Sequence, residues 1–87
     1  MPTICAFHGI TIRMYYDDHL PPHFHAYRAE NSAKYCIRTG RRLAGRLPQR
    51  ADAMVLKWQK MHQFELRRNW RLALQHRPLI LIEPLDD

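Results

Sequence analysis

The chain has 87 residues, which allows a single domain with one core, and its hydrophobic share of 46% lies outside the range of disordered chains. No apolar run approaches the roughly 20 residues needed to cross a bilayer, and the first residues lack the features of a secretion signal. We therefore expect no membrane contact. Because Cys5 and Cys36 are the only cysteines and neither belongs to a CxxC pair, we also expect a reduced, cytoplasmic location.

The first half of the chain shows the two-residue alternation of half-buried strands. From Ile10 to Tyr16, apolar side chains alternate with threonine, arginine and tyrosine. Gly9 allows a tight reversal before this run, and the prolines at 21–22 mark a connector because they cannot donate to a strand ladder. The pattern predicts four or five antiparallel strands, at residues 3–8, 10–16, 23–29 and 33–38 and in a short piece ending near residue 45.

The second half shows the three- and four-residue spacing of an amphipathic helix. Pro48 suits a first helical turn, and no glycine or proline follows before Pro78. Phe64 lies off the apolar stripe, which leaves room for a break near His62. We expect a helix over residues 47–76 and a C-terminal strand or tail over 79–85. The stripe consists of Ala51, Val55, Trp58, His62, Leu66, Asn69 and Ala73.

The predicted fold is therefore α+β, in a single domain over residues 1–87. Residues 1–46 form an antiparallel, four- to five-stranded meander sheet, and the long C-terminal helix covers one face of it. His62 and Asn69 lie on the helix stripe, and we interpret them, with Trp70, as polar and aromatic parts of the core.

Strand alternation predicts that the other sheet face is basic and aromatic. If the apolar residues point at the helix, the residues between them point away. Cations there would contact phosphates and flat rings would stack on bases, as single-stranded nucleic acid requires. The formal net charge of +6 fits an acidic partner such as RNA, although it also fits a surface that only maintains solubility. The expected contacts are Arg13, Lys34 and Arg38 for phosphate and Tyr15 and Tyr27 for stacking.

Histidines are concentrated in the pattern His19-x3-His23-x-His25. Residues two apart on a strand share a face, so His23 and His25 would present two imidazoles about 7 Å apart at their Cα atoms. They could act as general acid and base on a ribose 2′-hydroxyl and a leaving oxygen. They could also chelate a metal ion, with His19, Asp18 or a helix residue as a further ligand. A third interpretation is ordinary surface structure.

Common cofactor and metalloprotease signatures are absent from the chain. It contains no GxxxxGK[ST], no GxGxxG and no HExxH, so the sequence predicts no cofactor.

A family resemblance covers nearly the whole length of the chain. Its most specific part is Pro21-Pro22-His23-Phe24-His25-Ala26. With the other matching positions, this motif resembles the small bacterial family called domain of unknown function 4160. Those positions are Pro2-Thr3-Ile4, Phe7, Gly9, Ile10, Arg13-Met14-Tyr15, Asp18-His19, Gly40, Leu43, Gly45, Leu47-Pro48, Trp58, His62, Glu65-Leu66, Asn69-Trp70 and Glu83-Pro84-Leu85.

The resemblance implies a short, stand-alone bacterial protein, and it implies a partner. Members of this family are often encoded beside another small family, domain of unknown function 2442, in an arrangement similar to toxin–antitoxin pairs. The chain departs from the family pattern in two ways: residues 28–32 lack the expected glycine, and Cys5 and Cys36 are not part of it.

The sequence favours a toxin–antitoxin-type module that binds RNA, with cleavage by His23 and His25 as an extension of that activity. One alternative is a non-catalytic interaction subunit that docks a homodimer mate or a cognate antitoxin-like protein. A second alternative is a metal-dependent enzyme that uses His19, His23 and His25.

Overall fold

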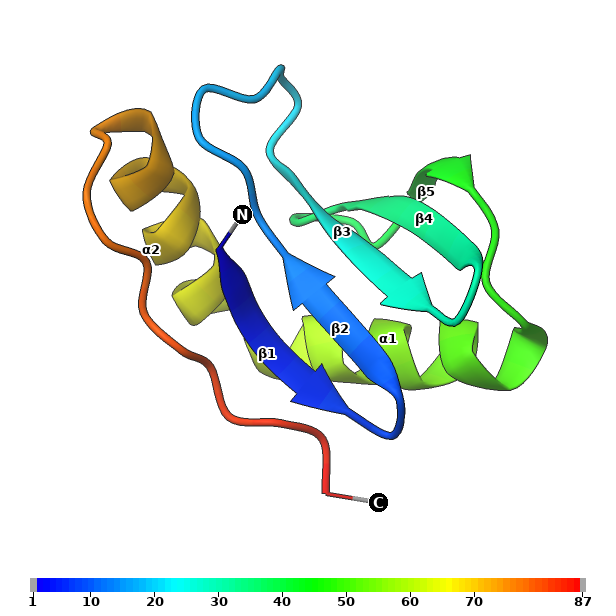
Figure 1. Ribbon diagram of the computed structural model, residues 1–87. Coiled ribbons are helices and arrows are strands. Elements are labelled where there is room, and N and C mark those ends of the chain that lie inside the picture. The colour runs from blue at the N-terminus through cyan, green and yellow to red at the C-terminus, as the bar shows by residue number, and fades with distance from the viewer. Residues whose placement is uncertain (1, 87) are drawn as a thin grey trace.

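The computed structural model describes residues 2–86 and places five strands before two helices (Figure 1). The strands are β1 (Thr3–Phe7), β2 (Ile10–Arg13), β3 (His23–Arg28), β4 (Asn31–Cys36) and β5 (Arg42–Gly45), and the helices are α1 (Gln49–Met61) and α2 (Gln63–Leu74). Each strand pairs antiparallel with the next one along the chain. The predicted α+β class and the antiparallel meander, with five strands, are confirmed.

The strands bury alternate residues, as their sequence pattern predicts. Ile12, Phe24 and Tyr35, from three successive strands, are fully buried. Phe24 lies directly opposite Tyr35, and their rings stack with centroids 5.6 Å apart. The residue next to each of these along its strand, such as His25 after Phe24, therefore points to the opposite face of the sheet.

The long C-terminal segment is not one continuous helix, because it divides at His62, where the sequence left room for a break. This residue has φ −122° and ψ 36°, outside the helical region, and it ends α1 and precedes α2. The break turns the second apolar stripe, which contains Leu66 and Trp70, so that it stays in the core while Phe64 points to solvent. This resolves the mismatch of Phe64 with one continuous stripe. Neither helix in the described part of the chain has the length and hydrophobicity to span a membrane.

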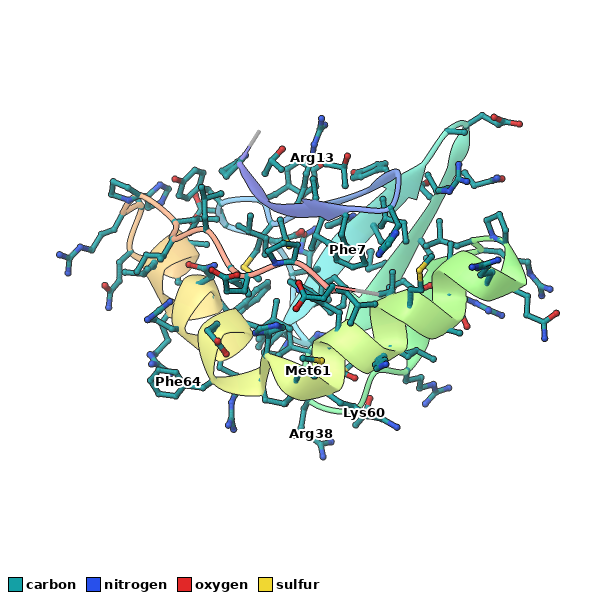
Figure 2. All side chains as sticks on the ribbon, turned by 90° about the horizontal axis from the view of Figure 1, so that it is seen from below. Phe7, Arg13, Arg38, Lys60, Met61 and Phe64 are labelled. Atoms are coloured by element: carbon teal, nitrogen blue, oxygen red, sulfur yellow. The ribbon has the colours of Figure 1, made fainter. Side chains whose placement is uncertain are left out.

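Trp58 on α1 lies at the centre of the core. Its ring is fully buried, with centroids 5.7 Å from those of both Phe7 and Phe24. Figure 2 shows β1 and β2 in one layer and the two helices in another below it. The C-terminal residues form an irregular tail rather than a strand, and it is tied to β1 by the Ile82 N–H, which donates to the Ile4 carbonyl at 2.8 Å.

The turn between β3 and β4 contains a strained residue where the family resemblance led us to expect a glycine. Ala29 has φ 54°, a left-handed conformation that disfavours any residue with a Cβ atom. Ala29→Gly should therefore raise the free energy of unfolding by about 0.5–1 kcal/mol, the relief of strain minus the greater backbone entropy of glycine. Thermal unfolding followed by circular dichroism measures this change. Ala6→Gly, at an exposed position within β1, is the control and should destabilise; equal destabilisation by both changes would contradict the explanation.

Candidate functional site

One carboxylate joins the two histidines of the PPHFHA motif. Asp18 Oδ2 lies 2.9 Å from His23 Nε2 and 3.1 Å from His25 Nε2. The two imidazole centroids are 5.1 Å apart. We call these three residues the Asp18 cluster. Its ligand-type atoms all lie within 4.8 Å of one another.

The loop between β2 and β3 and the start of β3 hold the Asp18 cluster in place. The backbone N–H of His19 donates to Asp18 Oδ1 at 2.9 Å. His23 Nδ1 lies 2.8 Å from the Pro21 carbonyl oxygen, and its ring packs against Trp70 of α2 at 5.4 Å between centroids. The Pro21 and Pro22 rings restrict the backbone immediately before His23. The carboxylate and the first imidazole are therefore each fixed by a second contact.

A row of three basic side chains crosses the sheet at His25. Arg13 on β2 pairs with His25 on β3, which in turn pairs with Lys34 on β4. Adjacent strands are about 4.8 Å apart, so the two cationic residues flank His25 with roughly 10 Å between their backbones. We call Arg13 and Lys34 the cationic row. A shallow hollow beside it is lined by His25, Ser32, Ala33, Lys34, Ala44 and Gly45.

Two tyrosines adjoin the cationic row. The Tyr15 ring meets His25 edge-on at 4.6 Å, and its hydroxyl shares a short hydrogen bond with that of Tyr27. The Arg13 guanidinium carbon lies 5.3 Å from the centre of the Tyr27 ring. Burial and the hydrogen bond with Tyr15 raise the pKa of Tyr27 to about 12, so its hydroxyl stays protonated at neutral pH.

The electrostatics of the Asp18 cluster favour an ionised carboxyl beside a neutral imidazole. Burial opposes ionisation of Asp18, but the N–H of His19 and the two imidazoles outweigh it and lower the pKa of Asp18. Burial lowers the pKa of His25, and the nearby His23 and Lys34 act in the same direction, whereas Asp18 opposes them. At neutral pH, His25 therefore has a nitrogen lone pair available for a proton or a ligand.

The structure brings most of the predicted site residues together. His23, His25, Tyr15, Tyr27, Arg13 and Lys34 form one connected group through the contacts above. His23 differs from our expectation in one respect: its side chain is only 2% exposed, because Trp70 packs against it. It is therefore placed to orient its neighbours rather than to touch a large substrate.

Arg38 and His19 do not join this group. β4 ends at Cys36, so strand alternation does not extend to Arg38. Figure 2 shows Arg38 and Lys60 on the helix side of the molecule and Arg13 on the opposite side. The His19 side chain is exposed, and its backbone N–H instead binds Asp18. Asp18 replaces His19 as the third member of the expected histidine cluster.

Sequence reasoning underestimated Asp18 and missed the role of Trp70. Asp18 precedes His23 by five residues in a loop, and neither strand nor helix periodicity says where such a side chain points. Trp70 was correctly interpreted as core, with 6% exposure, but its contact with His23 depends on the turn of α2 after the break at His62. The signal that the sequence offered for this cluster was the carboxylate of Asp18, shortly before the PPHFHA motif.

Comparisons with known proteins place the chain in a family. No curated protein and no solved structure matches it. A family model described as "Domain of unknown function (DUF4160)" matches residues 9–71, which include the whole Asp18 cluster and cationic row. The chain therefore belongs to the DUF4160 family, as its sequence motifs indicated.

Proposed function

We propose that the chain is an RNA-directed module of toxin–antitoxin type, which binds a single-stranded segment along the cationic row and cuts it beside His25. The observation that carries this proposal is the register that sets Arg13 and Lys34 on either side of His25. Two cations can hold phosphates while the partly exposed rings of Tyr15 and Tyr27 contact bases. The formal net charge of +6 favours the approach of an anionic strand.

In the proposed cleavage, each residue has a role in proton transfer or charge stabilisation that its exposure allows. In the reaction, the ribose 2′-oxygen attacks phosphorus and transfers its proton to the Asp18 cluster, while the bond to the 5′-oxygen breaks and that oxygen takes a proton from water. Arg13 and Lys34 stabilise the negative charge that develops on the phosphoryl oxygens. Asp18 and His25, at 17% and 20% side-chain exposure, are the members of the cluster that can reach the RNA.

RNA binding through the cationic row should be sensitive to salt. For single strands, the slope of log affinity against log salt is about −0.7 per phosphate contact, so removal of two contacts flattens it by about 1.4. We expect this change for Arg13→Gln combined with Lys34→Gln, measured by fluorescence anisotropy with a short single-stranded RNA.

The matched control removes the same charge from the helix side of the molecule. Arg38→Gln with Lys60→Gln should leave the slope close to that of the native chain, because both residues lie away from Arg13 in Figure 2. Equal flattening by the two double variants would show only a loss of net charge and would contradict the assigned surface.

A second candidate function is protein docking, and it is favoured by apolar side chains that lie in solvent. Met61 is 58% exposed, Phe64 64% and Leu81 76%. Phe64 and Leu81 border a groove between α2 and the C-terminal tail. A homodimer mate or a cognate antitoxin-like protein could bury this surface. Such apolar binding should depend little on salt, which distinguishes it from RNA binding.

A further inference from the structure

The contacts of His23 fix which of its nitrogens carries a proton. Nδ1 faces the Pro21 carbonyl oxygen at 2.8 Å, and a carbonyl only accepts hydrogen bonds, so Nδ1 donates. In a neutral ring, Nε2 then has a lone pair, and this lone pair faces Asp18 Oδ2 at 2.9 Å. A lone pair and a carboxylate oxygen that face each other in this way can both bind one metal ion.

The ligand-type atoms lie close enough together for one metal ion to bind all three after small side-chain rotations. Tetrahedral bonds of about 2.0–2.2 Å, the geometry usual for Zn²⁺, place neighbouring ligand atoms about 3.3–3.6 Å apart. The two distances from Asp18 Oδ2, to His23 Nε2 and His25 Nε2, are 2.9 and 3.1 Å. All three atoms lie within 4.8 Å of one another. Two imidazoles and one carboxylate are also the donor set that suits divalent transition metals with open coordination positions.

The surroundings of the Asp18 cluster resemble the support that metal ligands require. Ligating histidines usually donate their second ring N–H to a carbonyl or carboxylate, and ligating carboxylates accept further hydrogen bonds. The Pro21 carbonyl serves His23 in this way, and the His19 N–H serves Asp18. Asp18 and His25 keep 17% and 20% of their side chains exposed, so solvent or a substrate can reach the ligand atoms.

We propose that Asp18, His23 and His25 bind one divalent transition-metal ion of the Zn²⁺ class, with its remaining coordination positions open to solvent. The ion would occupy one ligand atom of each residue, so Asp18 Oδ1 would remain to accept the proton of the ribose 2′-oxygen, and the ion would add Lewis-acid charge beside a phosphate held by Arg13 and Lys34. The proposed ion occupies the same site as the proposed RNA cleavage. Its role as a source of catalytic charge rests on that proposed function, but its binding does not. Metal binding itself is measured without RNA, so the two proposals can fail separately.

An exposed histidine–carboxylate pair elsewhere in the chain provides an internal control. His76 Nε2 lies 2.9 Å from Asp17 Oδ2, but these side chains are 62% and 63% exposed. The pair offers two ligands rather than three and lacks the burial that fixes His23. If His25 bound metal only weakly, as an exposed surface histidine does, its replacement should change Zn²⁺ binding no more than replacement of His76.

Isothermal titration of the untagged, full-length chain with Zn²⁺ tests the proposal. We expect about one equivalent to bind, and we expect His25→Ala to weaken binding at least 100-fold because it removes a ligand. His76→Ala should bind as the native chain does. His25→Gln, which keeps more of the side-chain volume, should also lose the ion, and circular dichroism of each metal-free variant establishes that the fold is retained.

The results separate the possible explanations. Less than a tenth of an equivalent of bound Zn²⁺ in the native chain would overturn the metal site, as would equal losses in His25→Ala and His76→Ala. RNA cleavage that persists in excess EDTA would support the proposed function while overturning the role of the ion in it. Stoichiometric Zn²⁺ binding without RNA cleavage would support the metal site and overturn the nuclease.

Discussion

An Asp18→Asn variant is expected to cleave RNA at least 100-fold more slowly than the native chain while binding it with similar affinity. Asparagine has nearly the shape of aspartate and can still accept the His19 N–H. It lacks the negative charge, however, and its single oxygen cannot both accept the His19 N–H and face the two imidazoles. Loss of a group that positions or accepts a proton typically costs about 10²–10⁴ in rate. Cleavage of a labelled oligonucleotide and anisotropy titration measure the two quantities separately.

Asp17→Asn provides the matched control for this prediction. It makes the same chemical change at the neighbouring position, where the carboxylate faces the exposed His76. Cleavage by this variant should remain near that of the native chain. If both variants lost cleavage equally, or if Asp18→Asn also lost RNA affinity, the cluster would not have the catalytic role assigned to it.

Replacement of Trp58 by alanine is expected to destabilise the fold by about 3–5 kcal/mol, the usual cost of deleting a large buried aromatic ring. The indole is fully buried between Phe7 and Phe24. Its Nε1–H also donates to the Glu83 carbonyl at 2.8 Å, so the change removes a contact between α1 and the C-terminal tail. For a domain of this size, such a loss is a large part of the total stability. Urea denaturation followed by circular dichroism measures it.

Phe64→Ala deletes another aromatic ring but should change stability by no more than about 0.5 kcal/mol. The Phe64 ring is 64% exposed and contributes little to the core. Similar losses of stability in the Trp58 and Phe64 variants would contradict the observed difference in burial between these two side chains.

The strands and their two faces could be predicted because a two-residue alternation is a local property of the sequence. The alternation placed Phe24 in the core and His25 on the other face, and both positions are observed. It failed at Arg38, which was expected to continue β4. That strand ends at Cys36, and the chain then turns, with the Gly40 N–H donating to the Cys36 carbonyl. The pattern of residues alone did not mark this end.

The candidate site was only partly predictable, because strand and helix periodicity does not determine its central contacts. Strand spacing was enough to pair His23 with His25. The path of the loop that contains Asp18 depends on the Pro21 and Pro22 backbone and on the hydrogen bond from the His19 N–H. The burial of His23 depends on Trp70, whose position follows from the break between α1 and α2. The Trp70 contact is a tertiary feature, and the path of the loop is a local one that strand or helix periodicity does not describe.

The same features explain how a chain of this size can build such a site. A sheet alone offers rows of side chains on an exposed face, as the cationic row does. The loop before β3 adds a carboxylate from outside the sheet, and α2 adds a ring that shields one imidazole from solvent. Of the two histidines, one is therefore held rigidly and the other remains accessible. In the proposed metal site, the buried histidine would fix the ion and the accessible one would leave it open to a substrate.

Anomalous X-ray diffraction at the zinc edge, from crystals of the native chain grown with Zn²⁺, shows whether Asp18, His23 and His25 hold one ion. We expect one strong peak about 2.0–2.2 Å from the Asp18 carboxylate and from Nε2 of His23 and His25. The absence of a peak there, or a peak at His76 alone, would contradict this expectation.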